Sequence, residues 1–162
     1  MSGTVDSNLL GDGPYRIGHL TLNAPQSLNS LTRDMVEILL DSLLAWRDDE
    51  TVAAVFIDGI GDKAFCAGGD VQALRDSCLA MPGGPCEYAE NFFAREYRMN
   101  YILHTYPKPV ICWGHGVVMG GGLGILAGCS HRVVSERTRI GMPEVTIALF
   151  PDVGGSWFLN KM

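Results

Sequence analysis

The sequence lacks the features of several common classes of protein. Its five cysteines form no Cys-x-x-Cys pair and leave an odd thiol, so neither a zinc ribbon nor a disulfide framework is indicated. We expect reduced, mostly buried cysteines in a cytoplasmic protein. Lysine and arginine (12) are outnumbered by aspartate and glutamate (18), which gives a net charge of −6. No basic surface that would attract nucleic acid or an anionic membrane is therefore expected.

Sequence motifs for several catalytic classes are also missing. There is no GxxxxGK[ST] segment and no GxSxG segment, so a P-loop and a serine-hydrolase nucleophile elbow lose support. The first 12 residues have neither a basic region nor an apolar core, so no signal peptide is expected. The histidines show no metal-ligand spacing, and we predict no metal site. They are His19, His104, His115 and His131.

One long uncharged run, residues 110–130, requires a decision about membranes. Its glycines at 116, 120, 124 and 128 have the spacing of small residues that pack transmembrane helices. Seven of its 21 residues are glycine, however, and each costs about 1 kcal/mol inside a helix. A buried strand, a turn and a short packed helix explain the run better, so we predict no membrane association.

The remaining pattern predicts an α/β fold. Short runs of alternating or β-branched residues indicate strands, and apolar residues three or four apart indicate helices. Because the strands alternate with helices, parallel pairing is expected. The expected strands are 15–22, 52–57, 110–113, 132–135 and 139–142. One helix is expected to begin at Thr32, which caps it, and another to begin after Asp70. Two more helices are expected over 87–105 and about 121–127. Loops are expected at 59–69 and 78–86.

The domain organisation predicted from these elements is simple. Residues 1–14 form an N-terminal extension, and residues 15–162 form the core. Residues 154–162 resemble the first turns of a helix, and the sequence then stops. We therefore expect an incomplete core that belongs to a longer chain, with the missing part lying C-terminal or carried by a second chain.

Two glycine-bearing turns, 64–70 and 118–124, carry the chemistry. Each is expected to follow a strand and to open a helix, which points free backbone N–H groups outward. A single such turn is explained by a tight bend and close packing. Two that face each other would form an oxyanion hole.

Acidic residues supply the candidate reacting groups. Glu144 and Asp152 lie eight residues apart in turns that contain proline and glycine, where carboxylates are usually solvated. Glu96 lies in an expected helix and could be a surface charge, and Asp70 suits a helix cap. An alternative is a dinucleotide site, because residues 122–127 fit GxGxxA, although Glu144 does not end a clear second strand.

Taken together, these motifs resemble those of a known family. From Tyr15 to its end the chain is similar to the crotonase (enoyl-CoA hydratase/isomerase) superfamily, and most of all to its 3-hydroxyisobutyryl-CoA hydrolases. The resemblance implies a crotonase-like spiral of ββα units that binds an acyl-CoA, with the C-terminal helical part absent from this sequence. The motifs that carry it are residues 63–70, 92–97, 119–122, 142–144 and 150–155.

The resemblance also implies a site. The thioester oxygen is expected to accept hydrogen bonds from the N–H groups of Gly69 and Gly121. Hydratases of the superfamily use two glutamates, of which the second corresponds to Glu144 and the first to Gly124. Because that first acid is missing and Asp152 stands where hydratases usually have glycine, the implied reaction is thioester hydrolysis in valine catabolism.

The other expectations concern binding. Glu96, Gly68 and Gly120 are expected to contact the acyl group, and Lys63 is a candidate contact for CoA phosphate. CoA itself is expected along residues 23–31 and the loop before Gly69, as part of the substrate, with no separate cofactor. A homo-oligomer is one assembly that the family allows. Two alternatives stay open, a hydratase or isomerase and a non-catalytic acyl-CoA-binding subunit.

Overall fold

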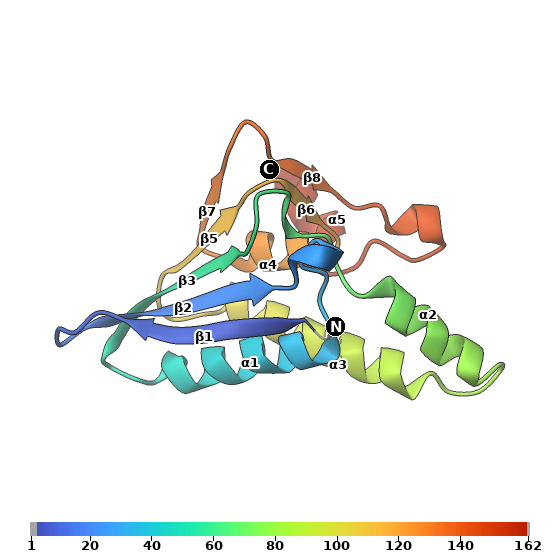
Figure 1. Cartoon of the computed structure of the whole chain (residues 1–162), viewed down its shortest axis with the longest axis horizontal. Helices are drawn as coiled ribbons and strands as arrows, with labels where there is room; N and C mark the ends of the chain where they lie inside the picture. Colours follow the sequence, from blue (N-terminus) through green and yellow to red (C-terminus); the bar gives the residue numbers. More distant parts are fainter. Residues whose placement is uncertain (1–2, 162) are drawn as a thin grey trace.

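Two β-sheets and a layer of helices make up residues 3–161, the part of the chain that this computed structural model describes (Figure 1). The larger sheet has the order β1-β2-β3-β5-β7, and the smaller has the order β4-β6-β8. The strands are β1 (Thr4–Leu10), β2 (Arg16–Asn23), β3 (Val52–Gly59), β4 (Ala64–Cys66), β5 (Val110–Gly114), β6 (Val117–Met119), β7 (His131–Val134) and β8 (Arg139–Gly141). The helices are α1 (Arg33–Arg47), α2 (Val71–Ala80), α3 (Glu87–His104), α4 (Gly121–Gly128) and α5 (Gly155–Phe158), with 3₁₀ turns η1 (Pro25–Ser27), η2 (Glu144–Ile147) and η3 (Leu159–Lys161).

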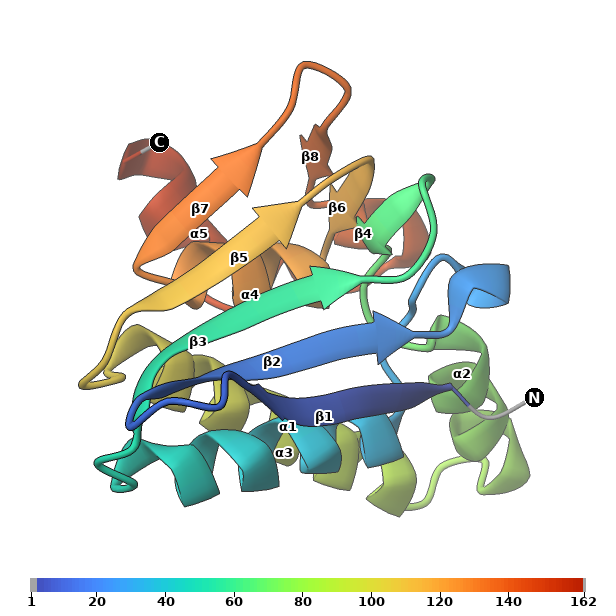
Figure 2. The same cartoon turned by 60° about the vertical axis from the view of Figure 1, so that its left-hand side comes forward.

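The strands pair in parallel, as the alternation of strands and helices predicts. β2, β3, β5 and β7 form one parallel array, and β4, β6 and β8 form another. The exception is β1, which runs antiparallel to β2 along the edge of the larger sheet (Figure 2). The sequence predicts no strand before Tyr15, because this segment shows no alternation of apolar and polar residues. In the structure only Val5 of β1 is buried, which explains why the pattern is missing.

The chain repeats a ββα pattern, which agrees with the predicted fold class. In successive units the first strand (β3, β5, β7) joins the larger sheet and the second (β4, β6, β8) joins the smaller one. The prediction of a continuous loop over 59–69 is wrong, because this segment contains β4. Each of the strands β4 and β6 has three residues, too few to show a period.

Two long helices, α1 and α3, lie side by side against one face of the larger sheet (Figures 1 and 2). Thr32 caps α1 by accepting a hydrogen bond from the Met35 N–H at 3.2 Å, as predicted. In α3 the aromatic and aliphatic residues do not all face the core. Phe92 and Ile102 are buried, but Tyr97 and Tyr101 are exposed.

The glycine-rich run folds as the buried-strand interpretation predicts. Residues 110–130 form β5, β6 and the buried helix α4 rather than one long helix. Within residues 3–161 the structure has no helix with the length and apolar character needed to cross a membrane. All five cysteines are free thiols, of which Cys66, Cys112 and Cys129 are buried and Cys78 is exposed.

Candidate active site

The two glycine turns meet at the start of α2 and α4. Gly68 and Gly120 have φ values of +103° and +50°, in the left-handed region that favours glycine. A Cβ added at Gly68 would lie 3.6 Å from the Gly121 nitrogen, so the turns are in contact. Among the described residues neither the Gly69 nor the Gly121 N–H finds an acceptor. This arrangement leaves two neighbouring N–H donors free for an incoming carbonyl oxygen.

A cavity of about 220 Å³ lies in front of these turns and brings most of the predicted site residues together. Its wall is largely apolar, with Phe92 and Phe93 from α3 and Phe150 from the segment before α5. No lysine, arginine or histidine lines it. The predicted residues that line it are Gly68, Gly69, Glu96, Gly120, Gly121, Glu144 and Asp152. Lys63 is not among them.

Glu96 is a buried acid, so the surface-charge interpretation is wrong. Its side chain on α3 is only 2% exposed, and one of its oxygens occupies the space that a Cβ on Gly121 would need. Burial, followed by the negative charges of Asp152 and Glu144, raises the pKa of Glu96 to about 8. Glu96 is therefore mostly protonated at neutral pH and can donate a hydrogen bond.

Glu144 lies at the first position of η2 and faces the second glycine turn. A Cβ added at Gly120 would be 2.6 Å from Glu144 Oε1, so a side chain there would displace the carboxylate, and the φ of +50° at Gly120 also favours glycine. Oε2 is buried and has no donor among the described residues. Burial is the main cause that raises the pKa of Glu144. An acceptor without a partner beside two free N–H groups is suited to take a proton from water or to attack a carbonyl carbon.

Asp152 has a partner that the sequence did not indicate. The Tyr97 hydroxyl donates a hydrogen bond to Asp152 Oδ2 at 2.6 Å, across 55 positions in sequence. Burial, then this hydrogen bond, raises the pKa of Tyr97, so the phenol stays protonated. Only the FFAREY motif, in which Tyr97 follows Glu96, could have drawn attention to it.

Gly124 does not line this cavity and packs against Val153. It lines a neighbouring cavity of about 610 Å³, which shares Tyr97, Phe150 and Asp152 with the acyl cavity. A Cβ added at Gly124 would lie 2.7 Å from Val153 Cβ and 3.2 Å from Asn100 Nδ2. Val153 itself has φ +44°, which is strained for a β-branched residue. Gly122 and Gly124 are both inside the buried helix α4, rather than in an open turn, so the dinucleotide interpretation loses its structural basis.

A second cavity, of about 260 Å³, lies where CoA is expected. It is formed by the loop after β2 and the loop before β4, and Lys63 lines it. Asn29 joins the two loops: its Nδ2 donates to the carbonyls of Ile60 and Ala64, and its Oδ1 accepts from the Ala24 N–H. These bonds are 2.9–3.0 Å long, and the side chain is fully buried.

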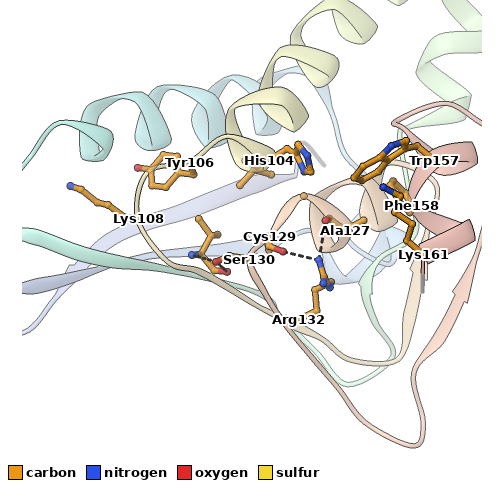
Figure 3. Close-up of a pocket in the computed structure, with 13 residues that line it drawn as sticks. His104, Tyr106, Lys108, Ala127, Cys129, Ser130, Arg132, Trp157, Phe158 and Lys161 are labelled. Carbon is orange, nitrogen blue, oxygen red and sulfur yellow. Dashed lines mark hydrogen bonds between the residues drawn. The ribbon is translucent and has the colours of Figure 1, made fainter.

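A third cavity, of about 320 Å³, lies between the ends of α3, α4 and α5 (Figure 3). It contains none of the predicted site residues, and its cations already have partners. Arg132 donates to the carbonyls of Ala127 and Cys129, and Lys161 lies over the ring of Trp157. It is not a candidate for the reacting centre.

One further prediction concerns Asp70. Asp70 caps α2 by accepting from the Ala73 N–H at 3.1 Å, as the sequence indicates. Within residues 3–161 no cluster of three or more His, Cys, Asp or Glu side chains is arranged to hold a metal ion.

Comparison with known proteins places the chain in one family. The family model described as enoyl-CoA hydratase/isomerase matches residues 17–162. A mitochondrial 3-hydroxyisobutyryl-CoA hydrolase from Xenopus tropicalis is 42% identical over 145 residues, covering 90% of this chain and 37% of that protein. The small ribosomal subunit protein mS47 from Neurospora crassa is 36% identical over 162 residues, covering 100% of this chain and 32% of that protein.

The solved structures show the same fold. A crystal structure of a carnitinyl-CoA dehydratase from Mycobacterium thermoresistibile matches with a TM-score of 0.86 and 42% identity, over 96% of this chain and 44% of that one. The chain spans between about a third and two fifths of the length of the curated relatives it matches.

Proposed function

Because the chain belongs to the enoyl-CoA hydratase/isomerase family, we propose that it contributes the active site of an acyl-CoA thioester hydrolase. The proposed substrate is 3-hydroxyisobutyryl-CoA, which is converted to 3-hydroxyisobutyrate and CoA. The observation that carries the proposal is the contact of Gly124 with Val153. Position 124 has no acid and does not line the acyl cavity, so no glutamate stands where hydratases of the superfamily have their first one. The glutamates beside the paired N–H groups are Glu144 and the protonated Glu96, which leaves Glu144 to act as the base.

The cavity supports the following division of roles. The N–H groups of Gly69 and Gly121 polarise the thioester carbonyl and stabilise the oxyanion; loss of one such donor typically raises a barrier by about 3 kcal/mol. Glu144 takes a proton from water as the water oxygen bonds to the carbonyl carbon, or attacks that carbon to form an anhydride that water then hydrolyses. The C–S bond breaks, and CoA leaves as a thiolate whose conjugate thiol has a pKa of about 8.5.

The other two carboxyl groups suit a polar acyl chain. Protonated Glu96 can donate to the 3-hydroxyl group, and Asp152 can accept from it or orient the water. An unsubstituted acyl chain would leave Glu96 and the second oxygen of Asp152 without a partner in a cavity whose wall is largely apolar, which is unfavourable. A hydroxylated acyl group therefore fits the cavity better than a plain one.

The CoA moiety is placed by the same proposal in the cavity beside Asn29. Lys63 lies there, away from the acyl cavity, as expected for a contact to phosphate rather than to the reacting carbonyl. No cofactor is required beyond the CoA of the substrate. The cytoplasmic location and a homo-oligomeric assembly stay predictions.

Two relatives support alternatives. The structural match to a dehydratase favours a hydratase or isomerase that works with Glu144 alone or with an acid from outside residues 3–161. The match to a ribosomal subunit protein favours a non-catalytic subunit that keeps the fold without turnover.

One paired assay separates these functions. The longest natural form of the protein is given 3-hydroxyisobutyryl-CoA and free thiol is measured, while the absorbance of crotonyl-CoA is followed in parallel. The proposal predicts thiol release and no change in enoyl absorbance. Enoyl loss without thiol would establish the hydratase or isomerase, and CoA binding without either reaction would establish the non-catalytic subunit.

A further inference from the structure

Asp152 is attached to the rest of the site by a single side-chain bond. Its segment, between η2 and α5, has no regular secondary structure. Tyr97 Oη donates to Oδ2 at 2.6 Å, and no donor among residues 3–161 contacts Oδ1. Both side chains line the acyl cavity. One carboxylate oxygen is therefore held, and the other is free to face a ligand.

The backbone on either side of Asp152 is fixed separately. Its carbonyl accepts from the Gly155 N–H at 2.7 Å, and the next residue, Val153, is pressed against Gly124 on α4. These contacts determine where the Cα of Asp152 lies. They do not fix the rotation of the carboxylate. The hydrogen bond from Tyr97 fixes that rotation.

We infer that Tyr97 is a positioning residue, which turns Asp152 so that Oδ1 points to the hydroxyl group of the acyl chain. This inference rests on the proposed function. It adds that the Asp152 carboxylate, held by Tyr97, is the group that makes the site prefer a hydroxylated substrate. Removal of the phenol oxygen leaves Asp152 in place but frees its carboxylate to rotate. The ligand hydroxyl then loses an oriented acceptor. The preference for a hydroxylated over an unsubstituted acyl group should therefore fall about tenfold.

The variant Tyr97→Phe tests this inference without removing the ring. Phe93 and Tyr97 have neighbouring rings with centroids 5.8 Å apart, and phenylalanine preserves that contact. Tyr101→Phe is a matched control, because Tyr101 lies one turn further along α3 and its side chain is 69% exposed. Asp152→Asn is the reference for complete loss of the carboxylate.

The readout is binding of two non-hydrolysable CoA thioethers, one with a 3-hydroxyalkyl group and one with the same alkyl group lacking the hydroxyl. Calorimetry on the longest natural form should show that Tyr97→Phe weakens binding of the hydroxylated thioether about tenfold and leaves the other unchanged. Tyr101→Phe should leave both affinities unchanged. Tyr97→Phe combined with Asp152→Asn should be no worse than Asp152→Asn alone.

Two results would overturn the inference. An equal loss of affinity for both thioethers would mean that Tyr97 only supports the fold of the cavity. A wild-type protein with no preference for the hydroxylated thioether would mean that Asp152 does not read the hydroxyl. Because binding is measured without turnover, the inference is decided independently of thiol release, which tests the proposed function.

Discussion

The Glu96 carboxyl lies against Gly121, in the space that a Cβ on that glycine would fill. A buried acid thus touches the residue whose N–H is proposed to bind the oxyanion. If this acid were ionised, its negative charge would oppose the charge that develops on the thioester oxygen. The raised pKa of Glu96, about 8, keeps the group neutral where the reaction is expected to run.

The first prediction is therefore a pH profile. Activity should fall above about pH 8, where Glu96 ionises, and Glu96→Gln should retain activity and lose this alkaline decline. The measurement is kcat/KM for thiol release between about pH 6 and about pH 10, a range that includes the pKa of Glu96. Glu90→Gln, an exposed change on the same helix, is the control. An unchanged decline in Glu96→Gln would assign it to another group.

Stability should depend on the same proton. The folded pKa of Glu96 is raised to about 8 from an ordinary value of 4.5, so between these values the folded state holds a proton that the unfolded state has lost. The free energy of unfolding should therefore decrease as pH rises through this window. The free energy of unfolding, measured by denaturant titration at several pH values, should fall less steeply with pH in Glu96→Gln than in Glu90→Gln. Equal slopes would mean that Glu96 is ionised in the folded protein.

Gly121→Ala should abolish most of the activity. The added methyl group must displace the Glu96 carboxyl, and this shifts the N–H that faces the carbonyl oxygen. We expect a loss of about 10²- to 10³-fold in kcat, as for removal of one oxyanion donor. Gly141→Ala is the control, because a Cβ there has no neighbour closer than 4.0 Å. Comparable activity of the two variants would contradict the placement of the oxyanion hole.

Gly124→Glu should not create a hydratase. Its side chain would collide with Val153 and Asn100, so we expect a lower melting temperature and no hydration of crotonyl-CoA. Val153→Gly should relieve part of the collision and recover part of the stability of the double variant. Hydration by Gly124→Glu alone would show that position 124 reaches the acyl cavity.

Asn29→Ala should loosen the CoA cavity. It removes three hydrogen bonds and leaves buried carbonyl groups unpaired, so the free energy of unfolding should fall by about 3 kcal/mol. Gln26→Ala, an exposed change in the same loop, should have little effect on stability. Equal effects on unfolding would mean that the loops are held together without Asn29.

Long, periodic elements were predictable from the sequence, and so was the family, whose model matches residues 17–162. Thr32 and Asp70 cap the helices expected to follow them, and the strands 52–57 and 110–113 are found with small changes at their ends. The periodicity works here because each element buries one continuous face.

Three features could not be predicted for definite physical reasons. The strands β4 and β6 are too short to show a period, and pairing with neighbours determines them. The burial of Glu96 depends on how α3 packs against Gly121, which no pattern within α3 records. The bond from Tyr97 to Asp152 joins residues 55 positions apart and exists only once the spiral has closed.

The most direct test of the account is the effect of Glu144→Gln on thiol release from 3-hydroxyisobutyryl-CoA. The variant keeps the size of the side chain beside Gly120 and removes its ability to accept a proton or to attack. We expect kcat to fall by about 10²- to 10⁴-fold while binding of the non-hydrolysable thioethers persists. Thiol release at the wild-type rate from a folded Glu144→Gln protein would show that Glu144 is neither the base nor the nucleophile.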